Sequence, residues 1–312
     1  MTLTDLKYIV ALARECHFGR AAERCHVSQP TLSVAIKKVE EQLGVMLFER
    51  GTSDVKVTQL GLRIVEQAQR VLVEAGQIKE IAQAGKDPLG GPLRVGAIYT
   101  IGPYLLPRLI PQVKTLAPRM PLILEENYTT SLAESLKRGD LDVAILALPF
   151  EQSGLVVQPI YQEPFRVLMP SNHPWAQQTA IGAHQLAEDQ LLLLGAGNCF
   201  RDQVLEVCPE CSGVGGLQRT LQGSSLETIR LMVASGIGVT VLPATAADDL
   251  PERNSLLATR PFEAPEPSRT IALAWRVTYP RSGAIDVIRK AILACALPGV
   301  QPLEAACQDV TV

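Results

Sequence analysis

The chain has 312 residues and a mass of 33.8 kDa, which is long enough for two or three domains. Its hydrophobic content of 47% and mean hydropathy of +0.15 are typical of a well-packed globular protein and exclude a largely disordered one. The net charge of −3 indicates no particular partner, and the chain contains no run of 18 or more apolar residues that would predict a membrane span.

The amino-terminal stretch carries Asp5 and Lys7 ahead of its apolar residues and has helical spacing, so it does not read as a signal peptide. We therefore expect a cytoplasmic, reducing compartment, where the seven cysteines would normally remain thiols. That expectation argues against a stable disulfide framework and leaves room for a transient, functional disulfide.

Residues 18–43, FGRAAERCHVSQPTLSVAIKKVEEQL, predict two helices joined by a tight turn. Ala21 and Ala22 are small enough for a close helix crossing, and Ser28 is placed to cap the second helix. Pro30 is tolerated in the first turn of that helix, where backbone N–H groups lack partners. The pattern is that of a helix-turn-helix.

The start of the second helix carries candidate DNA-contacting groups. Short side chains there reach base edges in a major groove, and the lysines that follow suit phosphates. The candidates are Ser28, Gln29, Pro30, Thr31, Ser33, Lys37 and Lys38. Residues 1–63 hold nine Lys/Arg and seven Asp/Glu, a weak bias, so the helix pattern alone fits an ordinary helical hairpin about equally well.

The residues that follow favour DNA binding. The segment LGVMLFERGTSDVKVTQLG predicts two short strands around a polar turn, a wing with Arg50 at its base for a minor groove or a phosphate. A long helix then runs from about Thr58 to Ala84. Its apolar or small positions alternate steps of four and three, a heptad-like seam suited to pairing with a second helix. A helix packed on its own core is the alternative.

The stretch AAERCHVSQPTLSVAIKKVEEQLGVMLFER resembles the LysR-type transcriptional regulators. Along nearly its whole length the chain is similar to the peroxide-sensing members of that family. The resemblance implies a winged helix-turn-helix domain over 1–58, a dimerising linker helix over 59–86 and a regulatory domain over 87–312. It also implies a homotetramer built from dimers, which binds double-stranded promoter operators and contacts RNA polymerase.

Beyond a Gly/Pro-rich hinge at 85–92, predicted strands and helices alternate, which indicates βα units and a parallel sheet. A strand near 269–275 returns to the first half. The regulatory domain should therefore hold two Rossmann-like α/β subdomains, at 87–162 with 268–312 and at 163–267. That layout resembles the periplasmic-binding-protein-like effector module of the family. A ligand site is expected between the subdomains or at strand carboxyl ends.

Three cysteines lie within thirteen residues, at 199, 208 and 211. A helix beginning near Asn198 would place Cys199 in its first turn, where free N–H groups and the helix dipole favour a thiolate, with Arg201 adding positive charge. A thiolate alone does not make a fast peroxide sensor, because that also needs donors to the departing hydroxide. The resemblance implies a peroxide pocket of Thr100, Thr129, Gly197, Asn198, Arg201, Asp202 and Arg269.

The resemblance also implies that Cys199 is oxidised by hydrogen peroxide and that Cys208 then forms a disulfide with it. Nine helical residues span about 13.5 Å, whereas disulfide-bonded Cα atoms lie within about 7 Å. Forming this disulfide would therefore unwind the helix. We expect Cys208 to dominate as resolving thiol, with the extra Cys211 as a competitor. Relatives commonly carry histidine where this chain has Asn198, whose amide can donate and accept hydrogen bonds but cannot titrate, which argues against an acid–base role there.

Other interpretations of these cysteines are weaker. The CPEC spacing suits zinc, but no second CxxC exists, and a thioredoxin-like pair should open a helix instead of following one. We expect no metal and no cofactor. The sequence thus predicts a peroxide-sensing regulator, not an enzyme. Two alternatives remain, a LysR-type regulator that binds a small metabolite and a thiol peroxidase-like enzyme.

Overall fold

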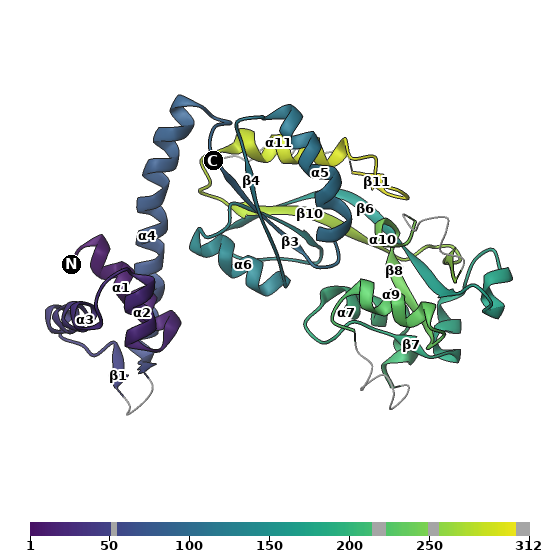
Figure 1. Cartoon of the computed structure of the whole chain (residues 1–312), viewed down its shortest axis with the longest axis horizontal. Coiled ribbons are helices and arrows are strands. Elements are labelled where there is room, and N and C mark those ends of the chain that lie inside the picture. Colours follow the sequence, from purple (N-terminus) through teal and green to yellow (C-terminus); the bar gives the residue numbers. More distant parts are fainter. Residues whose placement is uncertain (51–54, 214–222, 249–255, 304–312) are drawn as a thin grey trace. The chain divides into compact units, whose positions relative to one another are not determined.

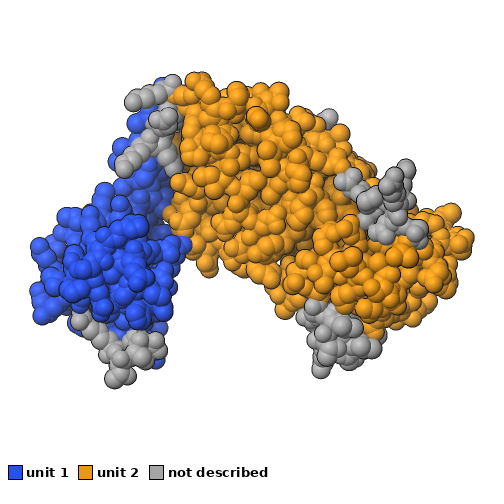
Figure 2. Space-filling model, in the orientation of Figure 1, with its two compact units in different colours: residues 1–86 blue, residues 87–312 orange. Residues whose placement is uncertain are grey.

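The computed structural model describes residues 1–50, 55–213, 223–248 and 256–303. The chain divides into two compact units, residues 1–86 and 87–312, which Figure 2 colours separately. Within the described ranges, no helix combines the length and apolar character needed to cross a bilayer.

The first unit is helical, with a small two-stranded wing. Its elements are α1 (Leu3–Glu15), α2 (Phe18–Arg24), α3 (Gln29–Leu43), β1 (Phe48–Arg50), β2 (Val55–Val57) and α4 (Gln59–Lys86). The Ser28 side chain caps α3 by accepting the N–H of Thr31 at 3.3 Å, and Pro30 lies in the first turn, as the sequence predicted. The antiparallel wing and the long helix are also confirmed.

A buried carboxylate joins α3 to the wing. Glu40 is only 5% exposed and accepts the backbone N–H groups of Leu47 at 2.8 Å and Phe48 at 3.1 Å. The surrounding core contains Leu12, Ile36 and Phe48, each almost fully buried. Because Glu40 satisfies two N–H groups that would otherwise be buried without partners, it fixes the wing relative to α3.

The second unit begins with parallel βα units. Strands β3 (Leu93–Ile98), β4 (Leu122–Asn127) and β5 (Val143–Ala147) are parallel, with α5 (Gly102–Leu116) and α6 (Thr129–Arg138) between them in sequence. In Figure 1, α5 lies beside α11 (Ser282–Leu293), on the side of the sheet opposite α6. These helices cover both faces of the sheet, as parallel strands require.

Two long antiparallel strands connect the halves of this unit. They are β6 (Leu155–Pro170) and β10 (Ser268–Arg276), paired in the sheet order β4-β3-β5-β10-β6-β8-β7. The expected parallel sheet is therefore only partly right, because both connecting strands run antiparallel to their neighbours. The sequence signalled only residues 165–170 of β6, since the first half of this strand lacks a continuous apolar run.

The other half holds β7 (Leu191–Leu192), α7 (Cys199–Val207), α9 (Leu226–Ala234), β8 (Val239–Pro243), α10 (Ala244–Ala247) and β9 (Leu257–Pro261). The strand expected at 191–195 pairs over just two residues. Short 3₁₀ helices at Pro174–Gln177, Ala183–Glu188 and Pro209–Gly213, and a final strand β11 (Gln301–Pro302), were not predicted. Each half has its own apolar core, one around Leu93 and Ile145, the other around Phe165 and Val204.

Candidate functional site

Cys199 is a free, half-buried thiol at the first residue of α7. Asn198 is the N-cap residue, but its side chain does not cap the helix. Its Nδ2 instead donates to the carbonyl oxygen of Gly195 at 3.1 Å. The N–H groups of the first turn therefore have no partner from this side chain, and Cys199 lies at the positive end of the helix dipole.

A second helix begins at the same place. Thr129 is the first residue of α6, and its hydroxyl donates to the Cys199 sulfur at 3.7 Å. Thr129 follows β4 and Cys199 follows β7, so two strand-to-helix turns from different halves of the unit meet at the thiol. Such turns at strand carboxyl ends are where α/β proteins place reactive groups.

A cavity of about 10 Å³, about the space that one small molecule such as water needs, adjoins the thiol. Its lining residues are Ile98, Tyr99, Thr100, Asn127, Tyr128, Thr129, Gly197, Asn198 and Cys199. Gly197 has φ +92°, a backbone conformation that a side chain would strain. The rings of Tyr99 and Tyr128 meet edge to face, with centroids 5.3 Å apart. The cavity therefore has room for about one water-sized molecule and is too small for a metabolite.

A buried ionic network lies next to the cavity. Arg269, 2% exposed, donates to the hydroxyl of Thr100 at 2.8 Å, to its carbonyl at 3.0 Å and to Glu163 at 2.8 Å. Glu163 in turn accepts the N–H of Thr245 at 3.0 Å and its hydroxyl. The guanidinium lies over the Phe200 ring, 5.1 Å from its centroid. The network thus joins β3's carboxyl end, both connecting strands, α10 and α7.

The predicted pocket residues separate into two groups. Thr100, Thr129, Gly197 and Asn198 line the cavity with Cys199, and Arg269 contacts it through Thr100. Two others are not among the lining residues. Arg201 donates to the carbonyl oxygen of Leu194 at 3.5 Å, and Asp202 is exposed in the first turn of α7.

Sequence reasoning missed Tyr128, Glu163 and Phe200. Tyr128 stands directly before Thr129, and Phe200 directly after Cys199, so both could have been inferred from their neighbours in the sequence. Glu163 gave no local signal, because its role depends on pairing with a residue 106 positions away.

Cys208 is bonded to Cys211, and this was not expected. Their Cα atoms are 5.5 Å apart, and the residues are 0% and 1% exposed. Cys208 is the C-cap residue of α7, and Cys211 lies in the 3₁₀ helix that follows, in a turn closed by the hydrogen bond from the Cys211 N–H to the Cys208 carbonyl oxygen at 3.0 Å. The 3₁₀ turn brings the two sulfurs of CPEC within bonding distance, so Cys211, expected as a competitor of Cys208, is its partner in this structure.

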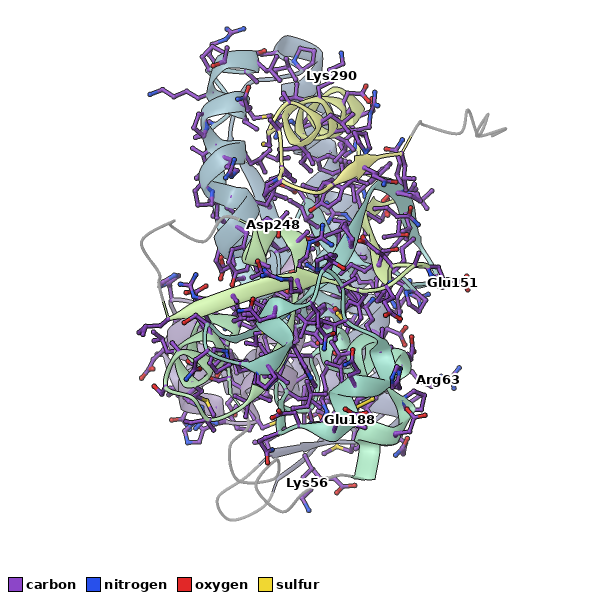
Figure 3. The ribbon with its side chains drawn as sticks, turned by 90° about the vertical axis from the view of Figure 1, so that its right-hand side faces the viewer. Lys56, Arg63, Glu151, Glu188, Asp248 and Lys290 are labelled. Atoms are coloured by element: carbon purple, nitrogen blue, oxygen red, sulfur yellow. A yellow bond between two sulfur atoms is a disulfide. The ribbon has the colours of Figure 1, made fainter. Side chains whose placement is uncertain are left out.

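A larger cavity, of about 1040 Å³, lies elsewhere in this unit. It is lined by residues 148–153, by both connecting strands and by Gln203, Glu206 and Val207 of α7. Figure 3 labels Glu151, one of these lining residues. Gln203 donates to the Leu148 carbonyl at 2.9 Å, which ties α7 to the first half of the unit.

The predicted DNA-contacting residues, apart from Arg50 of β1, lie at the N-cap and along the first part of α3. Gln29, Pro30, Thr31 and Lys37 are exposed, and Ser33 is half-buried. The Ser28 hydroxyl also shares a hydrogen bond with that of Thr31 at 2.8 Å. Lys56 of the wing is exposed (Figure 3). The side chain of Arg50 is outside the described part of the chain, so its predicted role stays a prediction.

Among the described residues, no group of three or more His, Cys, Asp and Glu side chains is arranged to hold a metal ion.

The chain belongs to the LysR family of bacterial regulators. Residues 3–62 match the family described as bacterial regulatory helix-turn-helix protein, lysR family, and residues 86–295 match the LysR substrate binding domain. The family and the fold are thus those that the sequence predicted.

Among its relatives is the DNA-binding transcriptional dual regulator OxyR of Escherichia coli K12, 42% identical over 94% of this chain and 95% of its own length. A hydrogen peroxide-inducible genes activator of Pectobacterium carotovorum is also 42% identical, over 94% and 96% of the two chains. Among solved structures, a full-length OxyR mutant from Pseudomonas aeruginosa is 53% identical, with a TM-score of 0.80 over 97% and 98%. A hydrogen-peroxide-bound OxyR mutant from Corynebacterium glutamicum has a TM-score of 0.63 at 33% identity, over 94% and 92%.

Proposed function

We propose that this chain is a DNA-binding transcriptional regulator that senses hydrogen peroxide through Cys199. The observation that carries the proposal is the free Cys199 thiol beside a cavity that fits one small molecule, with the Thr129 hydroxyl 3.7 Å from its sulfur. The names of the relatives agree with it.

The chemistry follows from the donors around the sulfur. The Cys199 thiolate attacks one peroxide oxygen, the O–O bond breaks, and the departing hydroxide takes a proton to become water. Because the Thr100 oxygen already accepts a hydrogen bond from Arg269, its own proton is free to donate toward the cavity. Thr100 and Thr129 can then stabilise the charge that develops on the leaving oxygen.

The sulfenic acid is resolved by Cys208. Its thiol attacks the Cys199 sulfur and releases water, so this step starts from the form in which Cys208 and Cys211 are both thiols. In the folded helix, nine residues separate Cys199 from Cys208 by about 13.5 Å, so the disulfide requires α7 to unwind.

Unwinding α7 disturbs contacts across the whole unit. Phe200 is 2% exposed, contacts Phe165 edge to face at 5.2 Å and lies under Arg269. Gln203 is tied to Leu148. Burial of one such aromatic side chain contributes about 1.5–3 kcal/mol. Formation of the Cys199–Cys208 disulfide must therefore offset a free-energy cost of that order when α7 unwinds.

We also propose that the chain acts in the cytoplasm as a homotetramer built from dimers and that it contacts operator DNA and RNA polymerase. The predicted seam of α4 consists of Leu60, Ile64, Ala68, Val71, Ala75, Ile78 and Ala82. Ile64 and Ala68 pack into the unit's own core. Support for pairing comes instead from Leu60, Val71 and Ile78, which are 42%, 39% and 70% exposed. Exposed apolar residues at heptad spacing favour a partner helix. Signalling is stoichiometric, one peroxide per disulfide, so we do not expect enzymatic turnover.

DNA footprinting on a promoter tests the proposed function. We expect the wild-type footprint to change when reductant is replaced by limiting peroxide, and the Cys199→Ser footprint to stay as it is under reductant. Cys16→Ser, which alters an exposed thiol of the other unit, is the matched control and should respond like wild type.

Two results would contradict it. A Cys199→Ser protein that still responds to peroxide, or a response that follows a small metabolite instead, would favour a regulator with a ligand in the larger cavity. Sustained peroxide consumption with a thiol reductant, retained by residues 87–312 alone, would favour a peroxidase.

A further inference from the structure

Cys208 has two possible partners, and they have opposite effects on α7. With the Cys208–Cys211 bond in place, α7 is helical from Cys199 to Val207 and Cys199 is a free thiol. A Cys199–Cys208 bond instead requires this helix to unwind. Because Cys208 has one sulfur, the two disulfides exclude each other.

When Cys208 is bonded to Cys211, α7 keeps its contacts with the rest of the unit. Phe200 remains on Arg269 and Phe165, Gln203 remains bound to Leu148, and Thr129 donates to the Cys199 sulfur. These are the contacts that the unwound state loses. Exchange from the Cys199–Cys208 bond to the Cys208–Cys211 bond therefore restores buried contacts, and this gives the exchange its direction.

We propose that Cys211 is a second resolving thiol, which ends the peroxide signal by intramolecular disulfide exchange. The proposal rests on the proposed function above. The Cys211 thiolate attacks the Cys208 sulfur of the Cys199–Cys208 disulfide. The Cys208–Cys211 bond forms, the Cys199–Cys208 bond breaks, and Cys199 leaves as a thiolate that takes up the proton Cys211 lost. No electrons enter or leave, so hydrogen peroxide remains the only oxidant required.

The position of Cys211 suits this attack. It lies three residues beyond Cys208, in the 3₁₀ helix that starts at Pro209, and its N–H donates to the Cys208 carbonyl at 3.0 Å. It is anchored in the same apolar core as Cys208, whereas Cys199 packs against the core of the other half. Cys211 therefore stays near Cys208 when the helix between Cys199 and Cys208 unwinds.

The exchange has a consequence for a second exposure to peroxide. The reset chain has a folded α7 and a reactive Cys199, but its Cys208 is held by Cys211. A second peroxide then leaves a sulfenic acid on Cys199 that Cys208 cannot resolve. The regulator is refractory until a reductant opens the Cys208–Cys211 bond, which is slow because both sulfurs are buried.

Time-resolved mapping of the thiols tests the exchange. The full-length chain is reduced completely, freed of reductant and treated with one equivalent of hydrogen peroxide. Samples are then alkylated at intervals, and their disulfide-linked peptides are identified by mass spectrometry. In wild type we expect the Cys199–Cys208 peptide to rise and then fall as the Cys208–Cys211 peptide rises and Cys199 becomes alkylatable again. In Cys211→Ser the Cys199–Cys208 peptide should persist at least about tenfold longer.

Three outcomes separate this proposal from the proposed function. If Cys211→Ser forms the Cys199–Cys208 disulfide and wild type holds it equally long, only the exchange is refuted. Cys211→Ala is a second variant that guards against misfolding of the buried site. If wild type, Cys211→Ser and Cys211→Ala all fail to form the Cys199–Cys208 disulfide, the proposed function fails as well. If Cys199→Ser acquires the Cys208–Cys211 bond as fast as wild type, peroxide oxidises the pair directly and the exchange is wrong. Cys16→Ser is the control for thiol number and should match wild type.

Discussion

In the proposed reaction, Thr129 and Thr100 offer hydroxyl groups to the reacting atoms from two different strand ends. Thr129 faces the sulfur, and Thr100 is held by two hydrogen bonds from Arg269. Neither group changes charge in the reaction, so their contribution comes from orientation. A donor fixed before peroxide arrives needs no reorganisation when charge develops on the leaving oxygen.

We predict that Thr129→Val slows the oxidation of Cys199 by peroxide about tenfold, because a hydroxyl donor worth about 1.4 kcal/mol is replaced by a methyl group of the same size. The second-order rate of thiol loss at limiting peroxide measures this. Thr129→Ser, which keeps the hydroxyl, should stay near the wild-type rate. Equal oxidation rates for wild type, Thr129→Val and Thr129→Ser would show that the Thr129 hydroxyl does not contribute to the oxidation of Cys199.

At the scale of elements, α7 determines when the disulfide can form. It is a nine-residue helix whose buried side chains, Phe200 and Val204, hold it in the core of the second half. Isolated helices of this length are marginal in water, so packing supplies most of its stability. The strength of that packing therefore sets how readily the helix unwinds.

We predict that Phe200→Leu accelerates conversion of the Cys199 sulfenic acid to the Cys199–Cys208 disulfide about fivefold. The change removes the ring contacts with Phe165 and Arg269, worth about 1 kcal/mol, from the folded helix. Quenched alkylation after a peroxide pulse gives this rate. Glu206→Ala, on an exposed position of the same helix, is the matched control. A Phe200→Leu rate no different from that control would mean that α7 packing does not limit the step.

At the scale of the whole regulatory unit, the halves are joined by side chains as well as by β6 and β10. Arg269 and Glu163 stand on these connecting strands and reach Thr100 on one side and Thr245 on the other. Tyr104 of α5 donates to Glu227 of α9 at 2.9 Å, and burial together with this carboxylate raises the pKa of the phenol well above its usual value. The phenol therefore keeps its proton, and can donate this hydrogen bond, to higher pH than an exposed tyrosine would.

We predict that Arg269→Leu lowers the free energy of unfolding by about 3–5 kcal/mol, because it leaves Glu163 as a buried charge without its partner. Urea unfolding of the full chain measures the loss. Arg119→Leu is the control, since Arg119 is 78% exposed and its pair with Asp87 contributes about 0–1 kcal/mol. A loss no larger than that of the control would show that the network is not structural.

The sequence by itself determined the order of elements, because each depends on neighbouring residues. Apolar spacing and the Ser28 cap predicted α3, the alternation of strands and helices predicted the α/β unit, and the start of α7 followed from Asn198 and Cys199. The same local patterns singled out Cys199 and its neighbours along the chain as candidate site residues, and they also indicated the family.

Tertiary structure alone decided which distant groups meet. Arg269 and Thr100 are 169 positions apart, and nothing local to either residue says that they bond. The CxxC spacing of Cys208 and Cys211 is local, but their bonding depends on the chain forming a 3₁₀ turn after α7. Local periodicity reports which face of an element is buried, whereas the partners on that face depend on how the elements pack, and that is a property of the whole fold.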